Sequence, residues 1–220
     1  MAKQIIECVP NISEGRDLER IDAIVASAKN ISGCKVLGVE PDADYNRTVI
    51  TIAGEPMAVK NAAYNIIEAA IELIDMSKHT GEHPRLGAVD VCPFIPLQNY
   101  TMEQCNDIAN DLAKSIAQDY GVPTFLYGYA ATSPERTLLS SLRKGEYESL
   151  ENRINDKKIH SPTQKPDYGP NNWTKQAEKS GGITIGTRDI LVAYNVNIDE
   201  HDARVSKYIG SLIRGSGRLI

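Results

Sequence analysis

The chain has 220 residues, of which 41% are hydrophobic and 24% are charged, and its formal net charge at pH 7 is −5. This size and composition are typical of one soluble domain, or of one domain and part of a second. The acidic balance and the lack of a Lys/Arg block argue against nucleic-acid or membrane-surface partners, and no apolar run approaches the ~18–20 residues of a membrane span.

The first hundred residues carry alternating strand and helix patterns. Short apolar runs bounded by turn residues predict strands, and apolar residues spaced three and four apart predict amphipathic helices. Pro56 lies in the first turn of the longest apolar stripe, where its missing N–H is harmless. In chain order the predicted elements are a strand at residues 4–9, a helix at 18–30, strands at 35–39 and 48–53, a helix from 56 to 74, and a strand at 89–95.

This order predicts an α/β (α+β) fold. The sequence β-α-β-β-α-β is that of the ferredoxin-like split arrangement, in which the helices pack on one face of a single sheet. The strand at 89–95 is apolar on both faces, so we expect it in the middle of the sheet. A further helix at about 102–120 and a strand at about 124–127 extend the arrangement.

The sequence pattern changes after residue 134. Short helical pieces are predicted at 137–143 and 147–154, and a stretch with little periodicity, residues 157–182, follows them. This stretch contains three prolines and ends in two glycines. A connection of this length is usually functional or a linker.

The last residues predict a strand at 189–197 and a helix at 200–214. One strand and one helix cannot bury two apolar faces alone, so we expect residues 1–186 to form one subdomain and residues 187–220 to begin a truncated second one. Apolar faces around Val192 and Leu212 would then lack cover, and we expect the chain to form a homo-oligomer.

The four cysteines predict structural roles. Cys8, Cys34 and Cys92 lie in apolar, strand-like surroundings, where free cysteine behaves as a small hydrophobic residue. No pair has the CxxC spacing of a metal site. The N-terminal residues reach an acid too early for a secretory signal. We therefore expect a cytoplasmic protein that holds no metal.

His83 is the main candidate for acid–base chemistry. Pro84 disfavours helical backbone at His83, so the imidazole is expected on irregular chain beside Arg85. A histidine pKa near 6.5 allows it to take and return a proton at cellular pH. An incidental surface histidine remains the alternative. His79 lies four residues earlier, as in a helical metal pair, but Gly81 and Pro84 oppose a continuous helix between them.

Three further features carry both a plain and a functional interpretation. Arg47 lies at the end of a turn. It is either an ordinary surface arginine or a residue whose planar guanidinium donates two hydrogen bonds to a carboxylate. The same turn contains three acids, Glu40, Asp42 and Asp44. Either all three are solvated, or one of them orients a histidine and favours its protonated form. Trp173, the only tryptophan, lies in the irregular stretch. Its ring either packs against the protein as a structural residue or stacks on a heteroaromatic ligand.

Eight stretches together carry a resemblance to a known family. They are residues 8–15, 46–49, 74–77, 81–96, 125–127, 143–148, 167–170 and 192–197. The chain resembles the formiminotransferase family over almost its whole length, and the block at 81–96 is highly specific. This resemblance implies two similar α/β subdomains that hold tetrahydrofolate, as co-substrate, in a groove between them. It further implies transfer of the formimino group from N-formimino-L-glutamate to tetrahydrofolate, giving 5-formimidoyltetrahydrofolate and L-glutamate in histidine degradation.

The resemblance also implies roles for individual residues. The family's catalytic histidine matches His83, and an imidazole that moves one proton between two nitrogens is worth roughly 10²–10⁴ in rate. Most of the remaining rate enhancement would come from holding the two substrates together in the right orientation. The acid that the family places near its histidine matches Glu40 best, with Asp42 as the rival. We expect Arg47 and Arg85 to hold substrate carboxylates.

The folate-contacting stretch of the family matches residues 169–181, which gives Trp173 a role. The candidate contacts are Gly169, Pro170, Asn171, Asn172, Trp173 and Gly181. This loop is a few residues longer than the family pattern, the family's second subdomain continues past residue 220, and the cyclodeaminase domain fused in some relatives is absent. The alternative to an active transferase is therefore a truncated, non-catalytic folate-binding remnant or an interaction module.

Overall fold

The computed structural model describes residues 2–191, 199 and 202–213. The chain divides into two compact units, residues 1–189 and 190–220. In the smaller unit, the helix α7 (Ala203–Ile213) falls within the helix predicted at 200–214, and none of its side chains is buried. The strand predicted at 189–197 lies mostly outside the described residues. The subdomain boundary after residue 186 and the self-association stay predictions.

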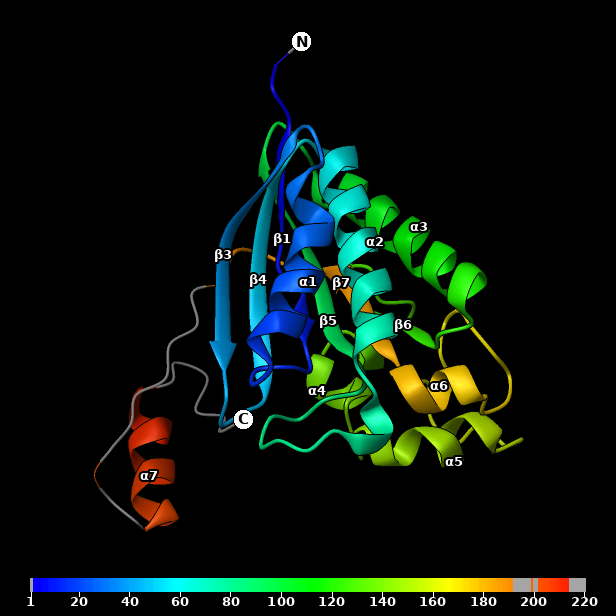
Figure 1. Ribbon diagram of the computed structural model, residues 1–220. Coiled ribbons are helices and arrows are strands. Elements are labelled where there is room, and N and C mark those ends of the chain that lie inside the picture. The colour runs from blue at the N-terminus through cyan, green and yellow to red at the C-terminus, as the bar shows by residue number, and fades with distance from the viewer. Residues whose placement is uncertain (1, 192–198, 200–201, 214–220) are drawn as a thin grey trace. The chain divides into compact units, whose positions relative to one another are not determined.

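The larger unit is built on one seven-stranded mixed sheet (Figure 1). Its strands are β1 (Ile5–Cys8), β2 (Asn11–Ile12), β3 (Cys34–Asp42), β4 (Arg47–Gly54), β5 (Val89–Gln98), β6 (Thr124–Gly128) and β7 (Ile183–Thr187). Strands β1 and β2 lie end to end between β4 and β5 and run antiparallel to both. Strand β3 pairs antiparallel with the outer side of β4. Strand β7 runs parallel to both β5 and β6 and lies between them.

Three long helices cover one face of this sheet (Figure 1). They are α1 (Leu18–Lys29), α2 (Pro56–Leu73) and α3 (Met102–Tyr120). The local sequence sets their ends: Asp17 accepts a hydrogen bond from the backbone N–H of Arg20 at the start of α1, and Thr101 and Gln104 form a capping box at the start of α3. Gly121 ends α3 in the left-handed conformation. These helices and the mixed sheet confirm the predicted α/β (α+β) class.

Short helices pack on the opposite face, over β5 and β6. They include α4 (Leu139–Leu142) and α5 (Leu150–Asn155), with single turns at η2 (Pro134–Arg136) and η3 (Tyr147–Ser149). Leu142 and Leu150 form a second apolar cluster with Val91, Phe125 and Tyr127. The main core lies on the other side, between the sheet and the long helices.

The region after residue 157 corrects the sequence analysis. The prediction of an irregular stretch up to residue 182 is wrong at its end, because α6 (Lys175–Ser180) lies within it and is capped by Thr174. Strand β7, which follows directly, was not predicted, although all five of its residues are buried and it lies inside the sheet. A run of only five residues that includes one glycine gives too weak a period-2 signal to be recognised as a strand.

Candidate functional site

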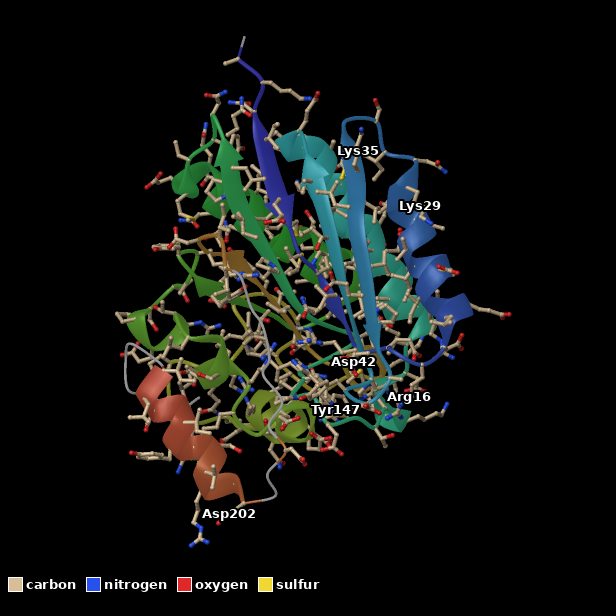
Figure 2. The ribbon with its side chains drawn as sticks, turned by 90° about the vertical axis from the view of Figure 1, so that its left-hand side faces the viewer. Arg16, Lys29, Lys35, Asp42, Tyr147 and Asp202 are labelled. Atoms are coloured by element: carbon tan, nitrogen blue, oxygen red, sulfur yellow. The ribbon has the colours of Figure 1, made fainter. Side chains whose placement is uncertain are left out.

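The sheet brings two irregular segments together at one of its ends. Strand β2 lies between β4 and β5, and Ile12 pairs with Thr48 on one side and with Val89 on the other. The turn that precedes β4 and the segment that precedes β5 therefore meet. Figure 2 shows Asp42 at this end of the sheet, together with Arg16 and Tyr147, whereas Lys35 lies at the opposite end. His83 belongs to the second segment, which has no regular secondary structure, as Pro84 predicted.

His83 is in direct contact with Arg47. Arg47 Nη1 lies 2.7 Å from His83 Nε2. A guanidinium has only donors, so Nε2 accepts this hydrogen bond and the ring is neutral with its proton on Nδ1. Burial, then the charges of Arg47 and Arg143, lower the pKa of His83 from 6.5 to about 4. At neutral pH the imidazole is thus a base whose Nε2 lone pair points at a guanidinium.

Arg47 has unused hydrogen-bonding capacity. It is half-buried, and its Nε is buried without a hydrogen-bond partner among the described residues. Burial and the nearby charge of Arg143 lower the pKa of Arg47. Buried polar groups without a partner are uncommon in native proteins and call for an explanation. A carboxylate placed against this guanidinium would accept from the free N–H and neutralise the charge.

The two acids predicted near His83 lie in different surroundings. The backbone of Asp42 lies opposite that of Arg47 in the β3–β4 hairpin. The Asp42 charge raises the pKa of His83, but burial and the charges of Arg47 and Arg143 lower it by more. Glu40 pairs with Val49 on exposed strand, two residues farther from the turn. Of the two acids, Asp42 thus lies nearer to the turn before Arg47, and its charge acts on the His83 ring.

Arg85 is held by groups of the chain itself. It is only 8% exposed, and its guanidinium donates to Glu146 and Glu148 at 2.7–3.0 Å and to His79 Nδ1 at 3.3 Å. The backbone N–H of Tyr147 also donates to the Arg85 carbonyl. These contacts fix the segment after His83 to η3, and they favour a positioning role for Arg85 over a direct contact with substrate.

An acid that the sequence analysis missed lies beneath the site. Asp90 is 1% exposed, forms an ion pair with Arg143 and accepts from the backbone N–H of Leu86. Burial raises the pKa of the Asp90 carboxyl, against the lowering effect of Arg143. The available signal was a single charged residue inside a strand that is otherwise apolar on both faces, because an ionised acid is buried only when it is paired.

The predicted folate-contacting stretch reaches this end of the sheet at two places. Trp173 is half-buried and packs against Tyr147, with ring centroids 6.2 Å apart, and its backbone N–H donates to Asn155. Gly181 forms a bridge with Gly87, four residues after His83. Gly169, Pro170, Asn171 and Asn172 have no described contact with His83 or Arg47.

The approach of Gly181 to Gly87 requires glycine on both sides. A Cβ on Gly181 would lie 2.2 Å from the Leu86 carbonyl oxygen, and one on Gly87 would lie 2.4 Å from the Ser180 carbonyl oxygen. Gly181 also has a positive φ of 67°, a conformation that costs other residues energy. These glycines join the end of α6 to the segment that carries His83.

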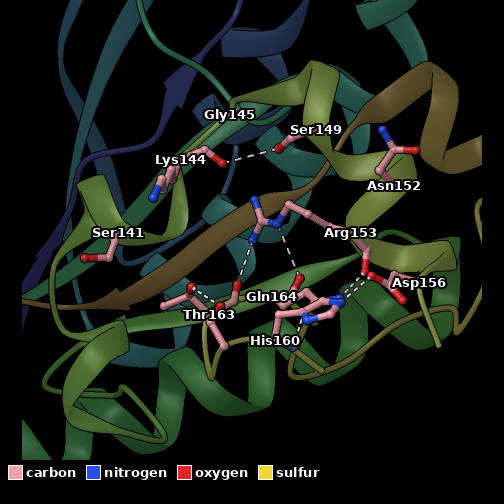
Figure 3. A pocket seen from close by; sticks show the side chains of 11 residues that line it. Ser141, Lys144, Gly145, Ser149, Asn152, Arg153, Asp156, His160, Thr163 and Gln164 are labelled. Carbon is pink, nitrogen blue, oxygen red and sulfur yellow. Dashed lines mark hydrogen bonds and ion pairs between the residues drawn. The ribbon is translucent and has the colours of Figure 1, made fainter. Parts of the chain in front are cut away.

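A separate cavity of about 440 Å³ lies between α4, α5 and the segment around His160 (Figure 3). Arg153 extends into it, but the guanidinium donates to the backbone carbonyls of Leu142, Thr163 and Gln164. His160 is likewise paired with Asp156. Because these side chains are already engaged within the chain, this cavity is a weaker candidate than the Arg47–His83 pair.

The described part of the chain lacks the features of a metal site and of a membrane-spanning helix. It contains no group of three or more His, Cys, Asp or Glu side chains placed to hold a metal ion. None of its helices is both long enough and apolar enough to cross a membrane. The four cysteines are all free and buried, as the sequence predicted for three of them.

Comparison with known proteins gives consistent matches. A family model described as the formiminotransferase domain, N-terminal subdomain, matches residues 5–188. A protein of Streptococcus pyogenes serotype M1 named glutamate formimidoyltransferase is 42% identical over 99% of this chain and 70% of its own length. A Thermoplasma acidophilum protein of the same name is 42% identical over 96% of this chain and 67% of its own length. The formimidoyltransferase-cyclodeaminase of Dictyostelium discoideum is 46% identical over 89% of this chain, which spans only 35% of that protein.

Proposed function

This chain belongs to the formiminotransferase family, and from that premise we propose that it acts as a glutamate formimidoyltransferase. The reaction moves the formimino group from N-formimino-L-glutamate to N5 of tetrahydrofolate and releases L-glutamate. The main support for the proposal is the hydrogen-bonded pair of Arg47 and His83, which places an unprotonated imidazole nitrogen beside a guanidinium whose Nε–H has no partner among the described residues.

The chemistry needs one proton to move between two amines. N5 of tetrahydrofolate attacks the formimino carbon, and the tetrahedral intermediate carries an N5 proton that must leave. His83 Nε2 takes this proton and returns it to the glutamate nitrogen as the bond between that nitrogen and the carbon breaks. Such a transfer contributes roughly 10²–10⁴ in rate.

Arg47 is proposed to bind a substrate carboxylate. A carboxylate would satisfy the buried Nε and offset the positive charge that lowers the pKa of His83. Substrate binding would thus release Nε2 from the guanidinium and raise its basicity at the moment when a base is needed. Asp42, next to Arg47 on the hairpin, is the acid that we propose in support of this pair.

Tetrahydrofolate is proposed to lie along residues 169–181. Support comes from Trp173, whose half-buried ring packs on Tyr147, and from the bridge between Gly181 and Gly87, which brings this stretch next to the segment of His83. No metal takes part in the proposed chemistry, because proton transfer and orientation account for each step.

The proposal is tested with His83→Ala. Turnover of N-formimino-L-glutamate with tetrahydrofolate should fall by roughly 10²–10⁴, since the proton carrier is lost. Tetrahydrofolate affinity, followed by fluorescence titration, should change little because the ring is not its main contact. His160→Ala is the matched control: it removes an exposed histidine that pairs with Asp156 and should leave turnover unchanged.

Three outcomes would contradict this proposal. Unchanged turnover of His83→Ala would remove the assigned acid–base role. Tetrahydrofolate binding without any turnover by the unaltered chain would instead favour the folate-binding remnant, and a lack of heat stabilisation by folate would favour an interaction module.

A further inference from the structure

His79 connects the two segments that meet at the site. Its Nδ1 accepts a hydrogen bond from Arg85 Nε, and its Nε2 lies 3.3 Å from the backbone carbonyl oxygen of Asn46. Asn46 directly precedes Arg47, and Arg85 follows His83 by two residues. One half-buried ring therefore spans the hairpin that carries the guanidinium and the segment that carries the imidazole.

Both contacts require the same form of the ring. Arg85 has no acceptor, so Nδ1 must be unprotonated, and Nε2 must then carry the proton that it donates to the Asn46 carbonyl. Burial is the main cause that lowers the pKa of His79 and keeps the ring neutral. The charged groups that act on it are Arg85, Glu14 and Arg16, with Glu148 on the far side of Arg85.

The segment around His83 has few other supports. Among the described residues, no backbone–backbone hydrogen bond involves residues 81–84. Its ends are held mainly by side chains: Asn46 Nδ2 and Arg16 Nη1 donate to the Thr80 carbonyl at 2.8 Å and 3.2 Å, and Glu146 and Glu148 hold Arg85. The backbone N–H of Tyr147 also donates to the Arg85 carbonyl. The relative position of His83 and Arg47 thus depends on side-chain contacts between the two segments: Asn46 with Thr80, Arg16 with Ala43 and Thr80, and His79 with Asn46 and Arg85. Of these, His79 is the contact that joins the hairpin to Arg85, on the other side of His83 from Thr80.

We propose that His79 is a positioning residue that holds His83 and Arg47 in the geometry needed for transfer. This inference rests on the proposed function, but it concerns the hydrogen bond between those two residues and so has a test without turnover. His79 itself touches no reacting atom.

The test uses two substitutions with different hydrogen-bonding capacity. His79→Leu removes both contacts, whereas His79→Asn keeps an acceptor near the position of Nδ1 for Arg85. Small displacements of catalytic groups reduce rates by up to about 10²-fold. We therefore expect kcat of His79→Leu to fall by about 10- to 10²-fold with a smaller change in KM, and His79→Asn to recover most of the loss. His160→Asn is the control.

A second measurement is an NMR titration of the His83 ring in the protein without substrate. Burial, and after it the charge of Arg47, hold the pKa of His83 at about 4, so loss of the Arg47 contact should raise this pKa part of the way toward 6.5 in His79→Leu and leave it low in His79→Asn. Identical His83 titrations in all three proteins would overturn the positioning role. If the unaltered chain shows no turnover, the proposed function fails, and the titration still decides the role of His79.

Discussion

Arg47 and Arg85 lie on the two segments that form the site, and both were expected to hold a substrate carboxylate. The structure separates them by what each guanidinium already contacts. Arg85 is surrounded by Glu146, Glu148 and His79, so its donors are engaged within the chain. Arg47 contacts an imidazole and keeps one buried N–H without a partner among the described residues.

This difference teaches how a binding arginine is distinguished from a structural one. A charge that is buried with its own counterions contributes to local order, and removing one partner is destabilising. A cation that is buried without a carboxylate costs free energy in the free protein, and that cost is recovered only when an anion arrives. The arrangement of Arg47 is therefore the one suited to ligand binding.

The largest expected effects come from the same substitution at the two arginines. Arg47→Met should lower kcat/KM for N-formimino-L-glutamate by about 10- to 10²-fold, since charged hydrogen bonds contribute about 1.5–3 kcal/mol. Its free energy of unfolding should change less than that of Arg85→Met, because it loses one hydrogen bond, to His83, together with a buried donor that has no partner among the described residues. Arg85→Met should instead destabilise the fold by about 1–3 kcal/mol, because it leaves His79 and the backbone of the segment less well held.

Steady-state kinetics and urea unfolding of both variants check this prediction. The assignment of substrate binding to Arg47 and of a structural role to Arg85 would be contradicted if Arg85→Met mainly raised KM while Arg47→Met mainly lowered the free energy of unfolding. A result in which both variants lose only stability would mean that neither guanidinium binds substrate.

The helices and strands of the first half of the chain could be predicted from the sequence. Long apolar stripes, with Pro56 in the first turn of α2, placed α1, α2 and α3 almost at their observed bounds. The sequence did not predict β7 and α6, because both are short and their burial depends on contacts with β5 and with the single turn η1 (Met76–Lys78), which are distant in the sequence. Periodicity over five or six residues does not report such contacts.

The same limit applies to the site. Pro84 and Arg85 made His83 a visible candidate, and its irregular backbone was predictable. The partners of Arg85 at 146 and 148, the pairing of Arg143 with Asp90, and the contact between His83 and Arg47 all join positions separated by at least 36 residues. Spacing along the chain does not encode them, so the roles of the two arginines could not be separated without the structure.

An intermediate effect is expected in the pH dependence of stability. The pKa of His83 is about 4 in the folded protein and 6.5 when unfolded, so the unfolded chain binds more protons between these values. The free energy of unfolding should therefore fall as pH decreases from about 6.5 to 4. Because the ring is half exposed, solvent screening keeps the loss smaller than the pKa difference alone implies.

Urea midpoints at pH 7, 6 and 5 measure this effect. His83→Asn should make the decrease shallower, since the titrating group is gone. Arg47→Met should give an intermediate slope, because it removes one of the causes that lower the pKa but leaves the burial. Equal slopes in all three proteins would show that His83 does not titrate in this window.

The smallest expected effect concerns the two acids of the hairpin. Asp42→Asn removes a negative charge that acts on both Arg47 and His83, so the pKa of His83 should fall further. The shift should remain below about one pKa unit, because interactions between partly exposed charges contribute up to about 1 kcal/mol. Glu40→Gln is the matched control on exposed strand and should leave the titration of His83 unchanged. An NMR titration of the ring in both variants decides between them. A larger shift of the His83 pKa in Glu40→Gln than in Asp42→Asn would assign the supporting acid to Glu40, as the sequence resemblance suggested. Asp42 would then not be the acid that acts on Arg47 and His83.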